Sequence, residues 1–149
     1  MLTINNYIEE NNDDFQNMIS SISKKVIKFK FNYDKLIYHE KVIMCTADLI
    51  ADVNNGGFHQ YYFNSYSNYA IEVPKYFNEL GLKNISKIVK EANNIFGYKG
   101  PSTIRKQRQE QLDNLTKNEN SKLSKLDNKF YRTKELNKYE SIAMKYIQK

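Results

Sequence analysis

The stretch ADVNNGGFHQYYFNS, residues 51–65, is the part of the sequence on which the fold prediction depends most. Gly56 and Gly57 accept positive φ angles without a steric penalty, and Asn54 and Asn55 in front of them also tolerate left-handed backbone. We therefore expect these four residues to end a helix and to reverse the chain. A second, short helix can begin at Gly57, where the missing side chain lets another segment approach the backbone closely.

The residues of this second helix form two pairs. Phe58 and Tyr61 are three positions apart, and Gln60 and Asn64 are four positions apart, so each pair shares one side of the helix. The aromatic pair is expected to enter the core. The two amides are expected to bind either backbone groups of the turn or a ligand.

Apolar residues recur at helical spacing through most of the remaining sequence. Ile85, Ile88, Val89, Ala92 and Phe96 give the clearest amphipathic pattern. No internal repeat is present, and we predict an all-α fold, a compact multi-helix bundle in a single domain. The segments expected to be helical are 15–22, 34–53, 70–80, 85–96, 102–115 with Ser102 as its N-cap, 123–130 and 136–147.

Two further segments are less regular. In residues 27–33 apolar and polar side chains alternate, which fits an extended connector or the end of a helix. Residues 117–120 contain no apolar side chain and are expected to form a loop. The helix over 34–53 is expected to bury an apolar stripe made of Leu36, Ile37, Ile43, Met44, Ala47, Ile50 and Ala51.

Size and composition restrict the possible functions. A chain of 149 residues with 40% hydrophobic residues is large enough for one domain with a core. No run of apolar residues is long enough for a membrane span, and the first residues lack the features of a secretory signal. The single cysteine, Cys45, fits a reducing compartment and is expected to be a buried thiol. We expect a cytoplasmic protein.

The net charge of +6 is unevenly distributed along the chain. Residues 1–74 carry 6 Lys/Arg against 9 Asp/Glu, whereas residues 75–149 carry 17 against 8. This basic half could attract nucleic acid or an acidic protein. Lysines that only solvate helix faces are the alternative, because 20 of the 23 basic residues are Lys and phosphate clamps favour Arg. The candidates for nucleic-acid binding are Arg105, Arg108, Lys122, Lys125, Lys129 and Arg132.

The pattern Asn55-Gly56-Gly57-Phe58-x-Gln60-Tyr61-x-x-Asn64 resembles the signature of the DNA mimic protein-like family, a bacterial domain of unknown function. The likeness covers roughly residues 36–149. We accordingly divide the chain into an N-terminal helical or extended segment, 1–33, and a family domain, 34–149. Further matching segments are Asp52-Val53-Asn54, Leu80-Gly81, Phe96-Gly97 and the stretch Leu126-Asp127-x-x-Phe130-Tyr131.

The resemblance implies an all-helical fold and, for the best-known relative, an acidic surface that imitates duplex phosphates and occupies DNA-binding proteins. This chain departs from that pattern because its net charge is +6 and mimicry needs closely spaced negative charge. An acidic cluster occurs only at Glu9, Glu10, Asp13 and Asp14. The family also resembles small accessory proteins found near bacterial toxin systems, which leaves an immunity-type role open.

The residues needed for common catalytic sites do not occur in a recognisable pattern. His39 and His59 are the two histidines, and no zinc-binding spacing, phosphate loop or serine elbow is present. We expect no metal and no cofactor. The favoured hypothesis is a non-enzymatic protein-binding module, a regulator related to DNA mimics or an immunity-type inhibitor. The alternatives are a nucleic-acid-binding protein that uses the basic half, and an enzyme centred on Asn55, His59, Gln60 and Asn64.

Overall fold

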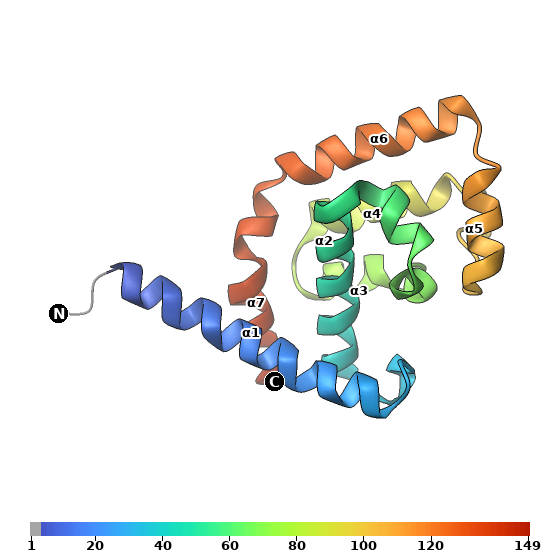
Figure 1. The fold of residues 1–149 in the computed structure, drawn as a ribbon. Coiled ribbons are helices and arrows are strands. Elements are labelled where there is room, and N and C mark those ends of the chain that lie inside the picture. The colour runs from blue at the N-terminus through green and yellow to red at the C-terminus, as the bar shows by residue number, and fades with distance from the viewer. Residues whose placement is uncertain (1–3) are drawn as a thin grey trace. The chain divides into compact units, whose positions relative to one another are not determined.

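The computed structural model describes residues 4–149, with side chains from Asp13 onward, and it contains helices and no strand in this range (Figure 1). The prediction of an all-α fold is confirmed. The α-helices are α1 Ile4–Lys28, α2 Tyr38–Phe63, α3 Val73–Glu79, α4 Lys83–Asn94, α5 Arg105–Asp113, α6 Lys117–Arg132 and α7 Tyr139–Ile147. Short 3₁₀ helices are η1 Tyr33–Lys35, η2 Ser65–Tyr69 and η3 Lys134–Lys138. No helix in the described part is both long and apolar enough to cross a membrane.

The described chain divides into two compact units. One consists of the residues up to Met44 together with Leu136–Lys149, and the other of Cys45–Glu135. Helix α2 passes from the first unit into the second. The division at residue 33 that the family resemblance implied stays a prediction. The side chains of Glu9 and Glu10, half of the acidic cluster, lie outside the described side chains.

In the first unit α1 packs on α7 through aromatic side chains. The rings of Phe15 and Tyr139 meet edge-on with centroids 5.9 Å apart, and the Tyr139 hydroxyl donates to the carbonyl of Ile43 at 3.2 Å. Segment 27–33 is a helix end and not an extended connector. Lys30 and Phe31 adopt positive φ, and the N–H of Phe31 bonds to Val26 O, which closes α1 with a Schellman turn.

In the second unit α4 lies in contact with both α3 and α6. Its predicted apolar face is largely correct, since Ile85, Ile88, Val89 and Ala92 are buried, whereas Phe96 lies beyond the end of the helix and is half-buried. The stripe predicted for α2 is wrong in part. Ile37 and Ala51 are exposed, and Leu49 and Val53 are buried in their place.

The starts of α5 and α6 also differ from the prediction. Residues 117–120 form the first turn of α6 and not a loop, because Thr116 and Glu119 make a reciprocal capping box with both bonds at 3.1 Å. Ser102 is not the N-cap of α5. That position is Ile104, whose N–H donates to the Ser102 hydroxyl.

Candidate functional site

The diglycine stretch forms a corner inside α2, and the chain changes direction there (Figure 1). Gly56 has φ −155° and ψ 23°, and Gly57 has φ 72° and ψ −176°. Both lie outside the helical region, so a second helical segment starts after them, as expected. Asn54 and Asn55, in contrast, do not take up the left-handed conformation that the sequence allowed; they remain in the last turn of the first segment.

Helix α6 satisfies backbone groups on both sides of this corner. A broken helix leaves N–H groups at the start of one segment and carbonyls at the end of the other without partners. The carboxylate of Asp127 accepts the Phe58 N–H at 2.8 Å, and the Tyr131 hydroxyl donates to Val53 O at 2.6 Å. Gly57 lies so close to α6 that a Cβ atom there would be 2.5 Å from Asp127 Oδ2.

The aromatic residues of the corner form core contacts, as expected. Phe58, Tyr61 and Tyr62 are all fully buried. The rings of Phe58 and Phe130 meet edge-on at 5.9 Å, which joins α2 to α6. The stretch from Leu126 to Tyr131, which appeared in the sequence only as part of a family resemblance, is therefore the direct structural partner of the diglycine motif.

The amides of the motif bind a carboxylate that the site prediction did not include. Gln60 Nε2 and Asn64 Nδ2 both donate to Asp52 Oδ1, at 3.4 and 3.1 Å. Asn55 Nδ2 in turn donates to Gln60 Oε1 at 3.1 Å. Gly56 belongs to this cluster, since a Cβ atom there would lie 2.1 Å from Gln60 Oε1. The available sequence signal was the position of Asp52, which lies four residues before Gly56 in the helical segment that ends at the corner.

Burial has the largest influence on the pKa of each of the two carboxylates at the corner, Asp52 and Asp127. It raises the pKa of Asp52, while the bonds from Asn64 and Gln60 act in the opposite direction. Burial also raises the pKa of Asp127, against the Phe58 N–H bond and the influence of His59. His59 thus acts on Asp127 while the three amides are arranged around Asp52. The hydrogen bonds described above join Asn55, Gln60 and Asn64 to one another and to Asp52, and none of them includes His59.

We expect the Asp52→Asn variant to reveal the cost of this buried charge as a function of pH. In the unfolded chain Asp52 has the ordinary aspartate pKa of 3.8, whereas in the folded chain its pKa is raised. As pH rises above 3.8 the unfolded chain therefore loses its proton first, and wild-type stability falls until the raised folded pKa is passed. Asparagine cannot titrate. The melting temperature of Asp52→Asn minus that of the wild type should therefore increase as pH rises through this window.

Thermal unfolding between about pH 4 and pH 7 measures this difference. Asp113→Asn changes an exposed carboxylate on α5 and is the matched control. A difference for Asp52→Asn that is independent of pH would contradict the assignment.

Helix α5 caps the C-terminal end of α2 with three side chains from one of its faces. The last carbonyls of a helix have no partner within the helix. Arg105 Nε and Gln109 Nε2 donate to Phe63 O at 3.1 and 3.0 Å. Arg108 donates to Tyr62 O and to Asn64 O, each at 2.7 Å. Cations at this position are also favoured by the helix dipole.

Arg108 is the most deeply placed charged residue of the described chain, with 0% of its surface exposed. Its guanidinium also donates to Ser102 O at 2.8 Å and to the side chain of Asn68 at 3.0 Å. Burial lowers its pKa to about 10, which leaves the group charged at neutral pH. The inclusion of Arg108 among nucleic-acid contacts was therefore wrong, because its donors are used inside the fold. Arg105 is partly committed to the same helix cap.

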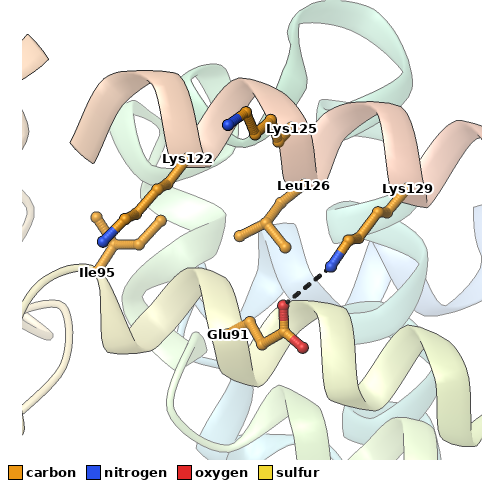
Figure 2. Close-up of a pocket in the computed structure, with 6 residues that line it drawn as sticks. All are labelled: Glu91, Ile95, Lys122, Lys125, Leu126 and Lys129. Atoms are coloured by element: carbon orange, nitrogen blue, oxygen red, sulfur yellow. Dashed lines mark ion pairs between the residues drawn. The ribbon is translucent and has the colours of Figure 1, made fainter. Parts of the chain in front are cut away.

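Three of the other predicted basic residues come together at one cavity. Lys122, Lys125 and Lys129 line a hollow of about 230 Å³ between α4 and α6 (Figure 2). Arg132, at the exposed end of α6, does not line it. In Figure 2, Lys122 and Lys129 extend from α6 toward α4, and Leu126 lies between them.

The described residues contain no group of three His, Cys, Asp or Glu side chains that could hold a metal ion. Cys45 is buried, as expected for a core thiol. Asp52 lines neither the cavity between α4 and α6 nor a second cavity between α3 and α4.

These contacts define a class of protein, an all-α domain whose diglycine corner in one helix is completed by an Asp-x-x-Phe-Tyr segment of a later helix. The chain belongs to the DMP19-like protein family, whose model matches residues 34–149. The suspected relation to DNA mimic proteins is thereby confirmed at the level of the family. Neither a search of curated proteins nor a search of solved structures gives a match.

Proposed function

We propose that this chain is a non-enzymatic protein-binding module whose partner presents an acidic, partly apolar segment to the cavity between α4 and α6. The observation that carries the proposal is the composition of this cavity. Ile95 and the small exposed part of Leu126, 5% of its surface, provide the apolar lining, and Lys122, Lys125 and Lys129 border it. Lys122 and Lys129 extend toward α4 (Figure 2).

The size of the cavity supports a macromolecular partner over a small molecule. Sites for small ligands usually enclose about 300–1,000 Å³. At about 230 Å³ the hollow is below that range, and it suits one or two side chains of a docked segment. A leucine or phenylalanine from the partner would cover Ile95 and the exposed edge of Leu126, and flanking carboxylates would meet the lysines.

The one carboxylate at the cavity is weakly held and can be replaced. Glu91 Oε2 lies 3.5 Å from Lys129 Nζ, and the two side chains are 42% and 60% exposed. Exposed ion pairs of this kind contribute about 0–1 kcal/mol. A carboxylate from the partner can therefore take the place of Glu91 at Lys129 at little cost.

The same features speak against nucleic acid as the partner. Phosphates need positive charge but gain nothing from an apolar floor. No aromatic ring for base stacking is found among the described residues that line the cavity. Arg105 and Arg108, two of the three arginines, are engaged in capping α2.

The proposed partner is opposite in charge to the partner of a DNA mimic. A mimic offers negative charge to a DNA-binding protein, whereas this cavity offers positive charge. The family relation supports binding to a protein as the general mode of action. On this proposal the chain acts as a regulator or immunity-type inhibitor that covers an acidic surface of its target.

The test uses a fluorescently labelled helical peptide with one leucine flanked by glutamates on one face. We expect the triple variant Lys122→Gln, Lys125→Gln, Lys129→Gln to bind it about tenfold more weakly than the wild type. Three exposed ion pairs of about 0.5 kcal/mol each account for this factor. Ile95→Ser should also weaken binding, although it changes no charge. Fluorescence anisotropy at low and at moderate salt measures both effects.

The matched control replaces Lys106, Lys117 and Lys134, which are exposed and line neither described cavity, with glutamine. It removes the same charge and should retain peptide binding. If control and cavity variants lose affinity equally, only net charge matters and the proposal fails. It also fails if a 20-base-pair DNA duplex binds more tightly than the peptide and depends on the same lysines, which would favour the nucleic-acid alternative.

A further inference from the structure

A second cavity lies between α3 and α4 and is larger than the first. Its volume is about 360 Å³, within the range of small-molecule sites. It is bordered by α3, by α4 and by the loop that follows α4. On α4 it uses Ser86, Lys90 and Asn94, a different stripe from the residues that face α6. It is independent of the proposed protein-binding cavity.

The most exposed aromatic residue of the described chain stands at this cavity. Tyr98 is 95% exposed, although it lies in a loop with defined hydrogen bonds. The carbonyl of Gly100 accepts Gln111 Nε2 at 3.3 Å, and the N–H of Ser102 donates to Gln111 Oε1 at 2.7 Å. The loop is thus anchored on α5, and it presents a tyrosine ring to solvent from a fixed backbone. A single exposed apolar residue is ordinary, but Ile71, 53% exposed, borders the same cavity.

The charge at this cavity is positive and comes from three separate elements. Lys75 lies on α3, Lys90 on α4 and Lys99 on the loop, and no carboxylate is among the described residues that line the cavity. Lys75 also has an interaction of its own within the fold. Lys99 lies over the Tyr98 ring, with its Nζ 5.9 Å from the centroid. A ligand that carries both an anionic group and a planar ring therefore matches the lysines and the tyrosine of this cavity.

A serine and three asparagine side chains complete the lining. Ser86 bonds to Pro74 O, and Asn93 bonds to Tyr62 and to Ala70 O, so these two form a satisfied floor. Asn78 and Asn94 are exposed side chains at the cavity. Amides of this kind donate and accept, as the edge of a nucleobase or a sugar hydroxyl requires.

We propose that the cavity between α3 and α4 binds a nucleoside phosphate, with the base stacked on Tyr98 and the phosphate held by Lys90 with Lys75. Lysine is a common phosphate ligand, and aromatic residues stack any nucleobase. The C-terminal end of α4, with its free carbonyl groups, repels an anion. We therefore place the phosphate at Lys90, which precedes that end, and the uncharged base at the loop that follows α4. A free nucleotide and the terminal nucleotide of a single strand share this chemistry.

The test follows ¹⁵N-labelled protein by NMR during titration with ADP and, separately, with a 5′-phosphorylated thymidine tetranucleotide. We expect saturable shifts at Lys90, Asn94 and residues 98–100 with one or both probes. Shifts with ADP identify free nucleotide as a source, and shifts with the tetranucleotide alone identify the end of a strand. Tyr98→Ala should weaken binding about tenfold, while Tyr98→Phe retains it, since the ring is what stacks. Lys90→Gln should weaken binding about fivefold.

Lys87→Gln is the matched control, because Lys87 is exposed on α4 but lines neither described cavity. It should bind as the wild type does. The proposal is overturned if neither probe produces saturable shifts up to about 10 mM, far weaker than a specific site. It is also overturned if ribose 5-phosphate binds as tightly as ADP and Tyr98→Ala has no effect, because the ring then recognises nothing.

Discussion

Replacing Arg108 with methionine is expected to lower the free energy of unfolding by about 3–5 kcal/mol. Methionine keeps most of the length and apolar volume of the side chain but removes all the donors. The guanidinium serves the carbonyls of Tyr62, Asn64 and Ser102 and the side chain of Asn68. Without it, buried acceptors at the end of α2 lose a charged donor, and the link between α2 and α5 is lost.

The Arg108→Lys variant separates charge from geometry. A lysine retains the positive charge, but a single amino group cannot reach acceptors that the planar guanidinium contacts through three nitrogens. We expect a loss that is smaller than that of Arg108→Met but still measurable. Urea unfolding followed by circular dichroism at neutral pH, where Arg108 is charged, measures all variants.

Lys106→Met is the matched control for this experiment, because Lys106 is exposed on the same helix. Its effect should stay within about 0.5 kcal/mol. If Arg108→Met unfolds at the same urea concentration as Lys106→Met, the cap on α2 does not stabilise the fold and the structural role given to Arg108 is wrong.

The second large effect is expected at the diglycine corner, where Gly57→Ala should cost about 3–5 kcal/mol. Two causes add. The backbone conformation at φ 72°, ψ −176° is almost restricted to glycine, which contributes about 1–3 kcal/mol of strain. The new Cβ would also lie 2.5 Å from Asp127 Oδ2, so the carboxylate must move and release the Phe58 N–H.

Two controls separate these causes. Gly81 has a φ of 76°, but a Cβ atom there would meet nothing within 4 Å, so Gly81→Ala reports the cost of a positive φ without a clash and should cost less than Gly57→Ala. In an Asp127→Ala background the clash is absent, and Gly57→Ala should then cost only the backbone strain of about 1–3 kcal/mol. Thermal or urea unfolding of the four variants completes the cycle. Equal costs of Gly57→Ala with and without Asp127 would contradict the contact.

Local pattern in the sequence was sufficient for the existence of most helices and for the break at the two glycines. The apolar period of 85–96 predicted α4, and the glycines predicted the break in α2, because both depend on the geometry of a few neighbouring residues. The errors at residues 117–120 and at Ser102 were also local. Thr116 and Glu119 have the spacing of a capping box, a signal that lies in the sequence itself.

The candidate site was only half predictable. The sequence placed Gln60 and Asn64 on one side of a helix, but it did not show that Asp52 receives both amides. The six basic candidates were treated as one group, and the structure separates them. Arg108 is a buried helix cap, and Lys122, Lys125 and Lys129 share a cavity. Lysine and arginine at similar helical spacing look alike until burial is known.

By itself the sequence determined an all-α chain, a helix broken at Gly56 and Gly57, and an aromatic pair that points to the core. These properties follow from hydrogen bonds within four residues and from the period of apolar side chains. Only the tertiary structure decided which distant groups complete the break. The partners are 69 residues apart for Phe58 and Asp127, 78 for Val53 and Tyr131, and 46 for Tyr62 and Arg108. Orphaned backbone groups at helix ends must find partners somewhere, but local geometry does not specify where, because any donor or acceptor that packing brings near can serve.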